Sequence, residues 1–131
     1  MRRLVDRARV ARLATSGPDA APHIVPVCFA LDGDTVYFVV DAKPKRTRDL
    51  KRLRNIAANP RVSLLVDHYE DDWGKLWWVR MDGRARVLAD GAESESAIKL
   101  LAMRYAPYRT SRPAGPVVAV AIDRWTDWSG S

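Results

Sequence analysis

Cysteine and histidine are scarce in this chain. Cys28 is the only cysteine among 131 residues, which excludes an internal disulfide and a metal site built from several cysteines. His23 and His68 are the only histidines, and neither stands in an HExxH motif or another metal-ligand spacing. We therefore expect no metal site, and we expect Cys28 to be a reduced residue of the core.

Long hydrophobic runs are also absent. The longest run lies around Val117 to Ile122, far short of the roughly 20 residues that span a bilayer. The first six residues, MRRLVD, carry charges but lack the apolar stretch of a secretory signal. These absences predict a cytoplasmic protein without membrane contacts. The length and the 47% hydrophobic content suit a single domain over residues 1–131.

Sequence motifs of catalysis and nucleotide binding are missing as well. There is no GxSxG, GxGxxG or Walker A sequence. No helix-turn-helix or RNP-type aromatic motif accompanies the basic residues, so nucleic-acid binding would rest on charge alone and we expect none. The catalytic residues stay unknown. Such a chain favours chemistry supplied by an organic cofactor, or a protein that binds without reacting.

What the chain does have is a concentrated cationic segment. Residues 43–61 hold eight basic side chains and one acid, Asp49, for a net charge of +7, whereas the whole chain carries +6. Acidic residues gather instead between Asp67 and Asp72. A cationic segment of this density indicates an anionic partner.

Alternating and β-branched stretches predict mostly strands, with few helices. Pro26 places its strand at a sheet edge or at a bulge, because proline lacks the N–H that a central strand donates. Asp32-Gly33-Asp34 predicts a hairpin turn, and Gly83 predicts a bulge or a second turn. The helices are too few to cover a parallel sheet, which favours an antiparallel barrel. The expected strands are 10–15, 22–31, 35–40, 61–67, 75–88 and 117–122, and the expected helices are 1–9, 47–58 and 92–105.

The helix expected over 47–58 shows apolar residues at three- and four-residue spacing. Thr47 suits its N-cap, and Asn59-Pro60 ends it. Several basic residues lie off the apolar stripe and are expected to form a solvated face. The stripe consists of Leu50, Leu53, Ile56 and Ala57, and the solvated residues are Lys51, Arg52 and Arg54.

The junction between the strand expected over 35–40 and this helix contains Lys45, Arg46 and Thr47. A helix N-terminus offers unpaired N–H groups and a partial positive charge. Together with two cations and a hydroxyl, these groups favour a phosphate or carboxylate site. The alternative interpretation is a solvated basic loop.

Five tryptophans form the second unusual feature. Trp77 and Trp78 are adjacent in an expected strand, so their side chains point to opposite faces of the sheet. Most of the five would be structural in any fold, because aromatic side chains bury a large area. One or two are expected near a ligand.

The run from Ala11 to Asp67 resembles the split β-barrel flavin and deazaflavin oxidoreductases, also called the pyridoxamine 5′-phosphate oxidase-like superfamily. The likeness extends to Trp128 and is strongest to an actinobacterial branch of coenzyme F420-dependent enzymes. Its most specific parts are KPKRTRDL (43–50), NPRV (59–62), WWVR (77–80) with GRA (83–85), and Trp125-x-x-Trp128.

This resemblance implies a mainly β (α+β) fold: a six- or seven-stranded antiparallel split β-barrel with two or three flanking helices. It also implies a homodimer with cofactor at the interface and a small-molecule substrate. Cofactor phosphate would be held by the loop before the helix, the ring would approach the second strand, and two tryptophan-bearing segments would wall the pocket, in part from the other subunit. The residues are Lys43, Lys45, Arg46 and Thr47 for the loop, Val25, Pro26 and Val27 for the strand, and Trp77, Trp78, Trp125 and Trp128 for the walls.

The cofactor expected from this resemblance is coenzyme F420, a deazaflavin whose phosphodiester and poly-glutamate tail match the cationic segment. The chain would be a reductase that transfers a hydride between the deazaflavin and a small organic substrate. FMN is the alternative cofactor, but FMN-binding relatives have a longer helix, a further basic residue and terminal extensions that are missing here. A non-catalytic F420- or haem-binding protein is a third alternative.

Overall fold

The computed structural model describes residues 1–40, 51–113 and 115–131. Seven strands form one sheet in the order β2-β1-β5-β6-β7-β4-β3, and every neighbouring pair is antiparallel. The strands are β1 (Ala11–Ser16), β2 (Pro22–Val27), β3 (Ala30–Asp32), β4 (Thr35–Val39), β5 (Arg61–His68), β6 (Trp77–Val87) and β7 (Val117–Ser129). The helices are α1 (Arg2–Arg7), α2 (Lys51–Ala58), α3 (Ala92–Arg104) and α4 (Ala106–Thr110), with a 3-10 turn, η1 (Trp73–Lys75).

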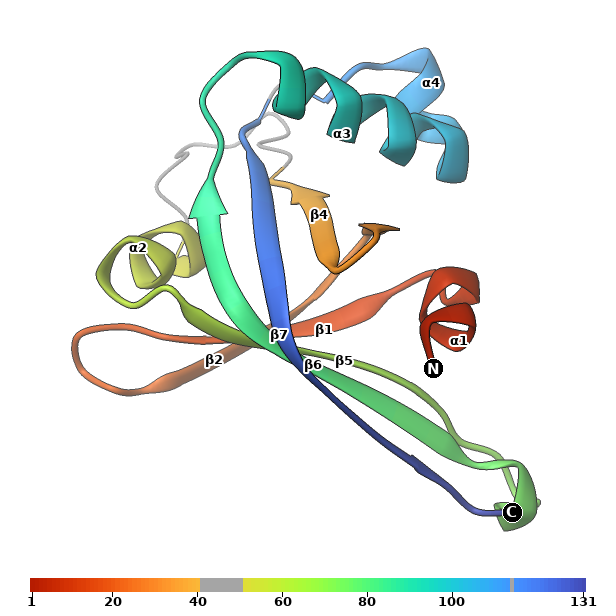
Figure 1. The fold of residues 1–131 in the computed structure, drawn as a ribbon. Coiled ribbons are helices and arrows are strands. Elements are labelled where there is room, and N and C mark those ends of the chain that lie inside the picture. Colours follow the sequence, from red (N-terminus) through yellow and green to blue (C-terminus); the bar gives the residue numbers. More distant parts are fainter. Residues whose placement is uncertain (41–50, 114) are drawn as a thin grey trace.

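Two long strands, β6 and β7, run through the middle of the molecule and curve strongly (Figure 1). Their pairing shifts register between Asp82 and Gly83: Arg124 pairs with Asp82 and Ile122 with Gly83, so Asp123 has no partner. The bulge therefore lies in β7, opposite the position in β6 where the sequence predicts a bulge or a turn. A Cβ on Gly83 would lie 2.3 Å from the carbonyl oxygen of Ala121, so only glycine allows this close approach of backbones. The architecture confirms the expected mainly β, antiparallel fold and is consistent with a split barrel. Four α-helices are present among the described residues, rather than two or three.

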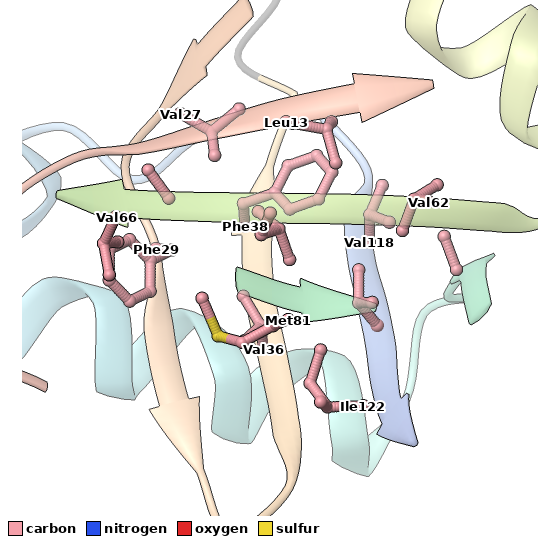
Figure 2. Packing of buried hydrophobic residues seen from close by; sticks show 14 of the residues in the cluster. Leu13, Val27, Phe29, Val36, Phe38, Val62, Val66, Met81, Val118 and Ile122 are labelled. Carbon is pink, nitrogen blue, oxygen red and sulfur yellow. The ribbon is translucent and has the colours of Figure 1, made fainter. Parts of the chain in front are cut away.

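The main core fills the space between the curved sheet's strands. Leu13, Phe38, Leu64, Met81 and Val118 are among its fully buried side chains, and they come from five different strands. Figure 2 shows side chains from these strands converging on one interior. Each of β1, β5 and the first part of β6 alternates buried and more exposed residues. One face of this part of the sheet therefore builds the core, and the other face is left outside.

The stretch 22–31 is two strands rather than the single strand that its composition predicts. Residues 22–27 pair with β1 at one edge of the sheet, whereas residues 30–32 pair with β4 at the other edge. Cys28 lies between them and is exposed, so the expectation of a core thiol is wrong. The edge position expected from Pro26 is confirmed. The expected hairpin also forms, since Asp32 pairs with Thr35 and Gly33 has a φ of 63°.

The C-terminal strand is longer than expected. β7 continues past Ile122, where the expected strand ends, to Ser129, and residues 124–129 also pair with β6. Residues 106–110 lie outside the expected helices and form α4. Among the described residues, no helix has the length and apolar character needed to cross a membrane.

Hydrogen bonds hold α2 against the end of β1. Asn55 is 2% exposed and donates from Nδ2 to Oγ1 of Thr15 at 3.0 Å, and Asn59 donates to Oγ of Ser16 at 3.3 Å. The helix also buries Ile56, but Ala57, expected on the apolar stripe, is exposed. Asn55 is buried on this helix where Ala57 was expected to be, because the hydroxyl of Thr15 gives the Asn55 amide a hydrogen-bond partner.

The tight contact between α2 and β1 gives a test of this arrangement. A Cβ on Gly17 would lie 2.3 Å from Oδ1 of Asn55. We expect Gly17→Ala to lower the free energy of unfolding by about 1–3 kcal/mol through overpacking. In an Asn55→Ala background the same change should cost clearly less, because the clashing amide is gone. Urea unfolding of all four chains measures this coupling, and equal costs in both backgrounds would contradict it.

A polar triad anchors the start of α3 to the sheet. Glu93 accepts hydrogen bonds from Oη of Tyr37 at 2.8 Å and from Nη2 of Arg86 at 2.9 Å and 3.1 Å. The bonds from Arg86 and then Tyr37 hold the pKa of the Glu93 carboxyl below its usual value. Burial, followed by the bond to Glu93, raises the pKa of Tyr37 to about 12.

The lowered pKa of Glu93 predicts a loss of stability in acid. Its contribution is complete above the ordinary glutamate pKa of 4.5 and is lost as the pH falls through the lower pKa of the folded state. We therefore expect the melting temperature to fall below about pH 4.5. Glu93→Gln should show a smaller fall over the same range, whereas an identical acid profile in both proteins would refute the role of this carboxyl.

Candidate functional site

A groove with a volume of about 640 Å³ lies on the outer face of β1, β2, β5 and β6. The outer face is the side of these strands turned away from the core. Pairing brings the groove residues together from distant parts of the chain: Ala14 lies opposite Ile24 and Ser63, and Leu65 lies opposite Arg12 and Arg80. The lining residues are Arg12, Ala14, Ile24, Ser63, Leu64, Leu65, Asp67, Tyr69, Trp78 and Arg80.

Local strand geometry decides which side chains reach this groove. Leu13, Leu64 and Met81 are fully buried in the core, so their strand neighbours point outward. The period of two therefore places Arg12, Ser63 and Arg80 outside. The alternation was visible in residues 61–67, but the sequence could not show that these residues lie beside Arg12, because strand register is set by pairing.

The polar side chains that the strands contribute to the groove all have polar partners. Ser63 Oγ donates to Oδ1 of Asp82 at 2.5 Å, and Arg80 Nε donates to Oδ2 of the same carboxylate at 3.3 Å. Arg12 and Asp67 form a looser ion pair at 3.8 Å. The middle of the groove is left to apolar side chains, which suits a flat, largely apolar ligand with a polar edge.

A second cavity of about 480 Å³ adjoins the groove and shares Ala14 and Ser63 with it. Its walls are more polar and include Ser16 and Arg61. Arg61 begins β5 just after the end of α2, so this cavity extends the outer-face site toward that helix. The two cavities together form one outer-face hollow, and the second part is the more polar.

Trp77 and Trp78 face opposite sides of the sheet, as their adjacent strand positions predict. Trp78 lines the groove, and Trp128 lies directly opposite it on β7 and is 44% exposed. Trp77 and Trp125 instead pack against the core. Trp77 also stacks on His68, and the Arg2 guanidinium lies 4.8 Å from the Trp125 ring.

The expected ring-binding strand is β2, an edge of the sheet. Val27 is buried and Val25 packs partly against the core, whereas Pro26 lies opposite Arg12 on the outer face. Because β2 has no second neighbouring strand in the described sheet, the backbone groups that point away from β1 are open to a ligand. The expected phosphate-binding residues Lys43, Lys45, Arg46 and Thr47 lie outside the described residues.

Arg52 differs from its expected solvated position. The residue is half-buried, and its Nε is buried without a hydrogen-bond partner among the described residues. Burial lowers the pKa of this guanidinium. A partly desolvated cation at the start of α2 is suited to an anionic ligand, since an unpaired buried charge is costly.

The described residues contain no group of three or more histidine, cysteine, aspartate or glutamate side chains that could hold a metal ion. The strands contribute two arginines, one serine and one aspartate to the groove, and each of these side chains has one of the partners described above. This arrangement can bind and orient a ligand.

The curved antiparallel sheet around one core is consistent with a split-barrel fold, and the groove lies on the outer face of this sheet. The family model for pyridoxamine 5′-phosphate oxidase matches residues 1–129, and the chain therefore belongs to this family. No curated protein matches the chain.

Solved structures share the fold at low sequence identity. A conserved hypothetical protein, Rv2991, from Mycobacterium tuberculosis is 22% identical, with a TM-score of 0.78 over 96% of this chain and 80% of the other. An FAD-binding protein from Mesorhizobium loti is 21% identical, with a TM-score of 0.75 over 96% and 87%. The haem storage protein HutZ from Vibrio cholerae is 13% identical, with a TM-score of 0.76 over 98% and 90%. At these identities the likeness shows the fold.

Proposed function

We propose that this chain is a coenzyme F420-dependent reductase that transfers a hydride between the deazaflavin and a small organic substrate. The observation that carries the proposal is the outer-face groove of about 640 Å³, whose apolar middle leads through the adjoining cavity toward α2. This helix lies within the cationic segment of residues 43–61. An apolar slot next to a polycation matches a flat ring with a polyanionic tail.

The residues present fit such a cofactor. Trp78 and Leu65 offer apolar surface to a ring, and the half-buried Arg52, with its unpartnered Nε, offers charge to an anion. Lys45, Arg46 and Thr47, with Lys43 nearby, would hold the phosphate. When bound, the deazaflavin supplies the hydride chemistry.

In the reaction, the chain itself would orient the cofactor ring and exclude water from it. The open edge of β2 at Val25, Pro26 and Val27 would hold the polar edge of the ring through backbone groups. Trp78 would fix the plane of the ring from the floor of the groove. Arg80, anchored by Asp82, is placed to offer positive charge at the groove wall.

The groove would be completed by a second copy of the chain in a homodimer. Its rim leaves large apolar side chains in water: Ile24 is 65% exposed, and Tyr69 is 66% exposed. Trp128 continues this apolar surface onto β7. A partner covering this face would bury these side chains, and Trp128 of one copy would then wall the site of the other, as family likeness implies. Trp125 packs against the core of its own copy instead.

FMN is the second candidate, because an FAD-binding protein shares the fold. A non-catalytic F420- or haem-binding role is the third, since a haem storage protein shares it too. Absorbance of the purified protein separates them: flavin gives a yellow protein and haem gives a Soret band. If the protein binds coenzyme F420 but the reduced coenzyme passes no hydride to any of a broad panel of acceptors, the protein is a carrier.

The first functional test is a fluorescence titration with coenzyme F420 and with FMN. We expect F420 to bind more tightly, and its affinity to fall with added salt, because the tail is held by charge. The double variant Lys45→Ala/Arg46→Ala should bind F420 at least about tenfold more weakly, equivalent to about 1.4 kcal/mol. Lys75→Ala/Lys99→Ala removes the same charge elsewhere and should bind normally. Unchanged affinity in the first variant would remove the proposed phosphate site.

The second test concerns the groove floor. Trp78→Ala should weaken F420 binding by about tenfold, because a stacked aromatic surface contributes about 1–3 kcal/mol. Trp73→Ala is the matched control, since Trp73 is 76% exposed and does not line the groove. Equal affinities of the two variants for F420 would show that the ring lies elsewhere.

A further inference from the structure

A third cavity, with a volume of about 360 Å³, lies between α1 and the neighbouring ends of β1, β5 and β6. Figure 1 shows α1 beside the start of β1. Val10, before β1, and His68, at the end of β5, both line the cavity, whereas α2 is bonded to the opposite end of β1. The cavity shares Arg12 and Asp67 with the groove and is otherwise lined by different residues. The proposed cofactor site does not use it.

Part of the cavity wall is apolar and includes a flat ring. Leu4, Ala8 and Trp77 line it and also pack against the main core, so their positions are fixed by the fold. The Trp77 ring is stacked with that of His68, with ring centroids 6.4 Å apart and an angle of 22° between the planes. Such a wall suits the planar, apolar part of a small ligand.

The remaining wall is cationic. Three arginines and one aspartate line the cavity, which gives a net charge of +2 with His68 neutral. The acids that line the cavity or stand next to a lining residue each have a partner, while Asp71 and Asp72, farther along the same loop, do not line it. The contacts are Asp67 with Arg12 at 3.8 Å, Asp6 with Arg104 at 3.7 Å, and Glu70 with Nε2 of His68.

Two of the lining arginines, Arg7 and Arg9, have no carboxylate partner among the described residues. Arg7 is exposed in the last turn of α1. The Arg9 guanidinium lies 4.7 Å from the centre of the Tyr105 ring and donates one hydrogen bond, to the carbonyl oxygen of Arg104. Most of its N–H groups are unused by the described residues, because a guanidinium carries five. Both cations are therefore available to an anion.

The backbone that carries these two arginines is held in place by the end of α3. Arg104 donates to the carbonyl oxygens of Asp6 and Ala8. Oη of Tyr105 lies 3.0 Å from the carbonyl oxygen of Arg9. These bonds fix the chain between α1 and β1, so the cations are positioned before a ligand arrives. Such preorganisation lowers the entropic cost of binding.

We propose that this cavity binds a small aromatic carboxylate, with the ring against Trp77 and its apolar neighbours and the carboxylate on Arg7 and Arg9. Arginine suits this role because its planar guanidinium can donate two parallel hydrogen bonds to one carboxylate. The site is a second ligand site that does not depend on the proposed function. Since Arg12 and Asp67 also line the groove, the bound ring lies beside it.

Calorimetric titration of the full-length chain with 2-naphthoate, in the absence of cofactor, tests the site. We expect sub-millimolar affinity for 2-naphthoate. Binding of 2-naphthalenemethanol, which keeps the ring and lacks the charge, should be at least about tenfold weaker. Inorganic phosphate, which has the charge and lacks the ring, should also bind at least about tenfold more weakly. If either control matches 2-naphthoate, or if 2-naphthoate does not bind at millimolar concentration, the proposal is overturned.

A pair of matched variants tests the role of the cations. Arg7→Gln should weaken the binding of 2-naphthoate about tenfold, because it removes a charge-assisted hydrogen bond. Arg3→Gln is the control, since Arg3 is also exposed on α1 but does not line the cavity. Circular dichroism checks that both variants fold. Equal affinities of the two variants for 2-naphthoate would overturn the assignment of the carboxylate.

NMR locates the bound probe. The indole N–H signal of Trp77 should shift when 2-naphthoate is added, whereas that of Trp78, which lines the groove and not this cavity, should stay in place. Trp77→Phe and Trp78→Phe assign the two signals. A shift of the Trp78 signal alone would put the probe in the groove. That result would overturn the second site and leave the cofactor proposal intact.

Discussion

The close approach of β6 and β7 at Gly83 is the constraint on which the rest of the structure depends. On one side of this bulge, β6 residues 77–82 pair with the C-terminal part of β7, and on the other side residues 83–87 pair with its first part. A side chain at Gly83 would occupy the space of the Ala121 carbonyl group. The bulge lets two long strands curve enough to enclose a core while continuing beyond it.

Strand alternation then divides the side chains between two tasks. The inward residues of β1, β5 and β6 form the core, in which Leu13, Leu64 and Met81 are fully buried. Their outward neighbours are left to form a groove that contains paired polar groups and unburied apolar ones. The same backbone thus provides both a core and an outer groove, which we propose as the binding surface. Groove residues can vary without disturbing the core, because they lie on the other face of the sheet.

Sequence reasoning succeeded where the signal was local. The hairpin at Gly33, the end of α2 before Pro60 and the edge strand containing Pro26 all follow from the chemistry of single residues, and all are present. Sequence reasoning failed where contacts between distant parts of the chain determine pairing and burial. Residues 22–31 have uniform strand character, yet they divide at Cys28 because their two halves find partners at opposite edges of the sheet. Asn55 is buried because Thr15 lies beside it.

The amino-acid sequence alone determined the antiparallel β character, the position of the helix within the cationic segment, the family likeness and the opposite orientations of Trp77 and Trp78. These depend on backbone preferences and side-chain periodicity within a few residues. Only the tertiary structure decided that Trp78 shares a groove with Arg12 and Ser63. The physical reason is that strand register is fixed by pairing between remote segments, whose energies depend on the whole core.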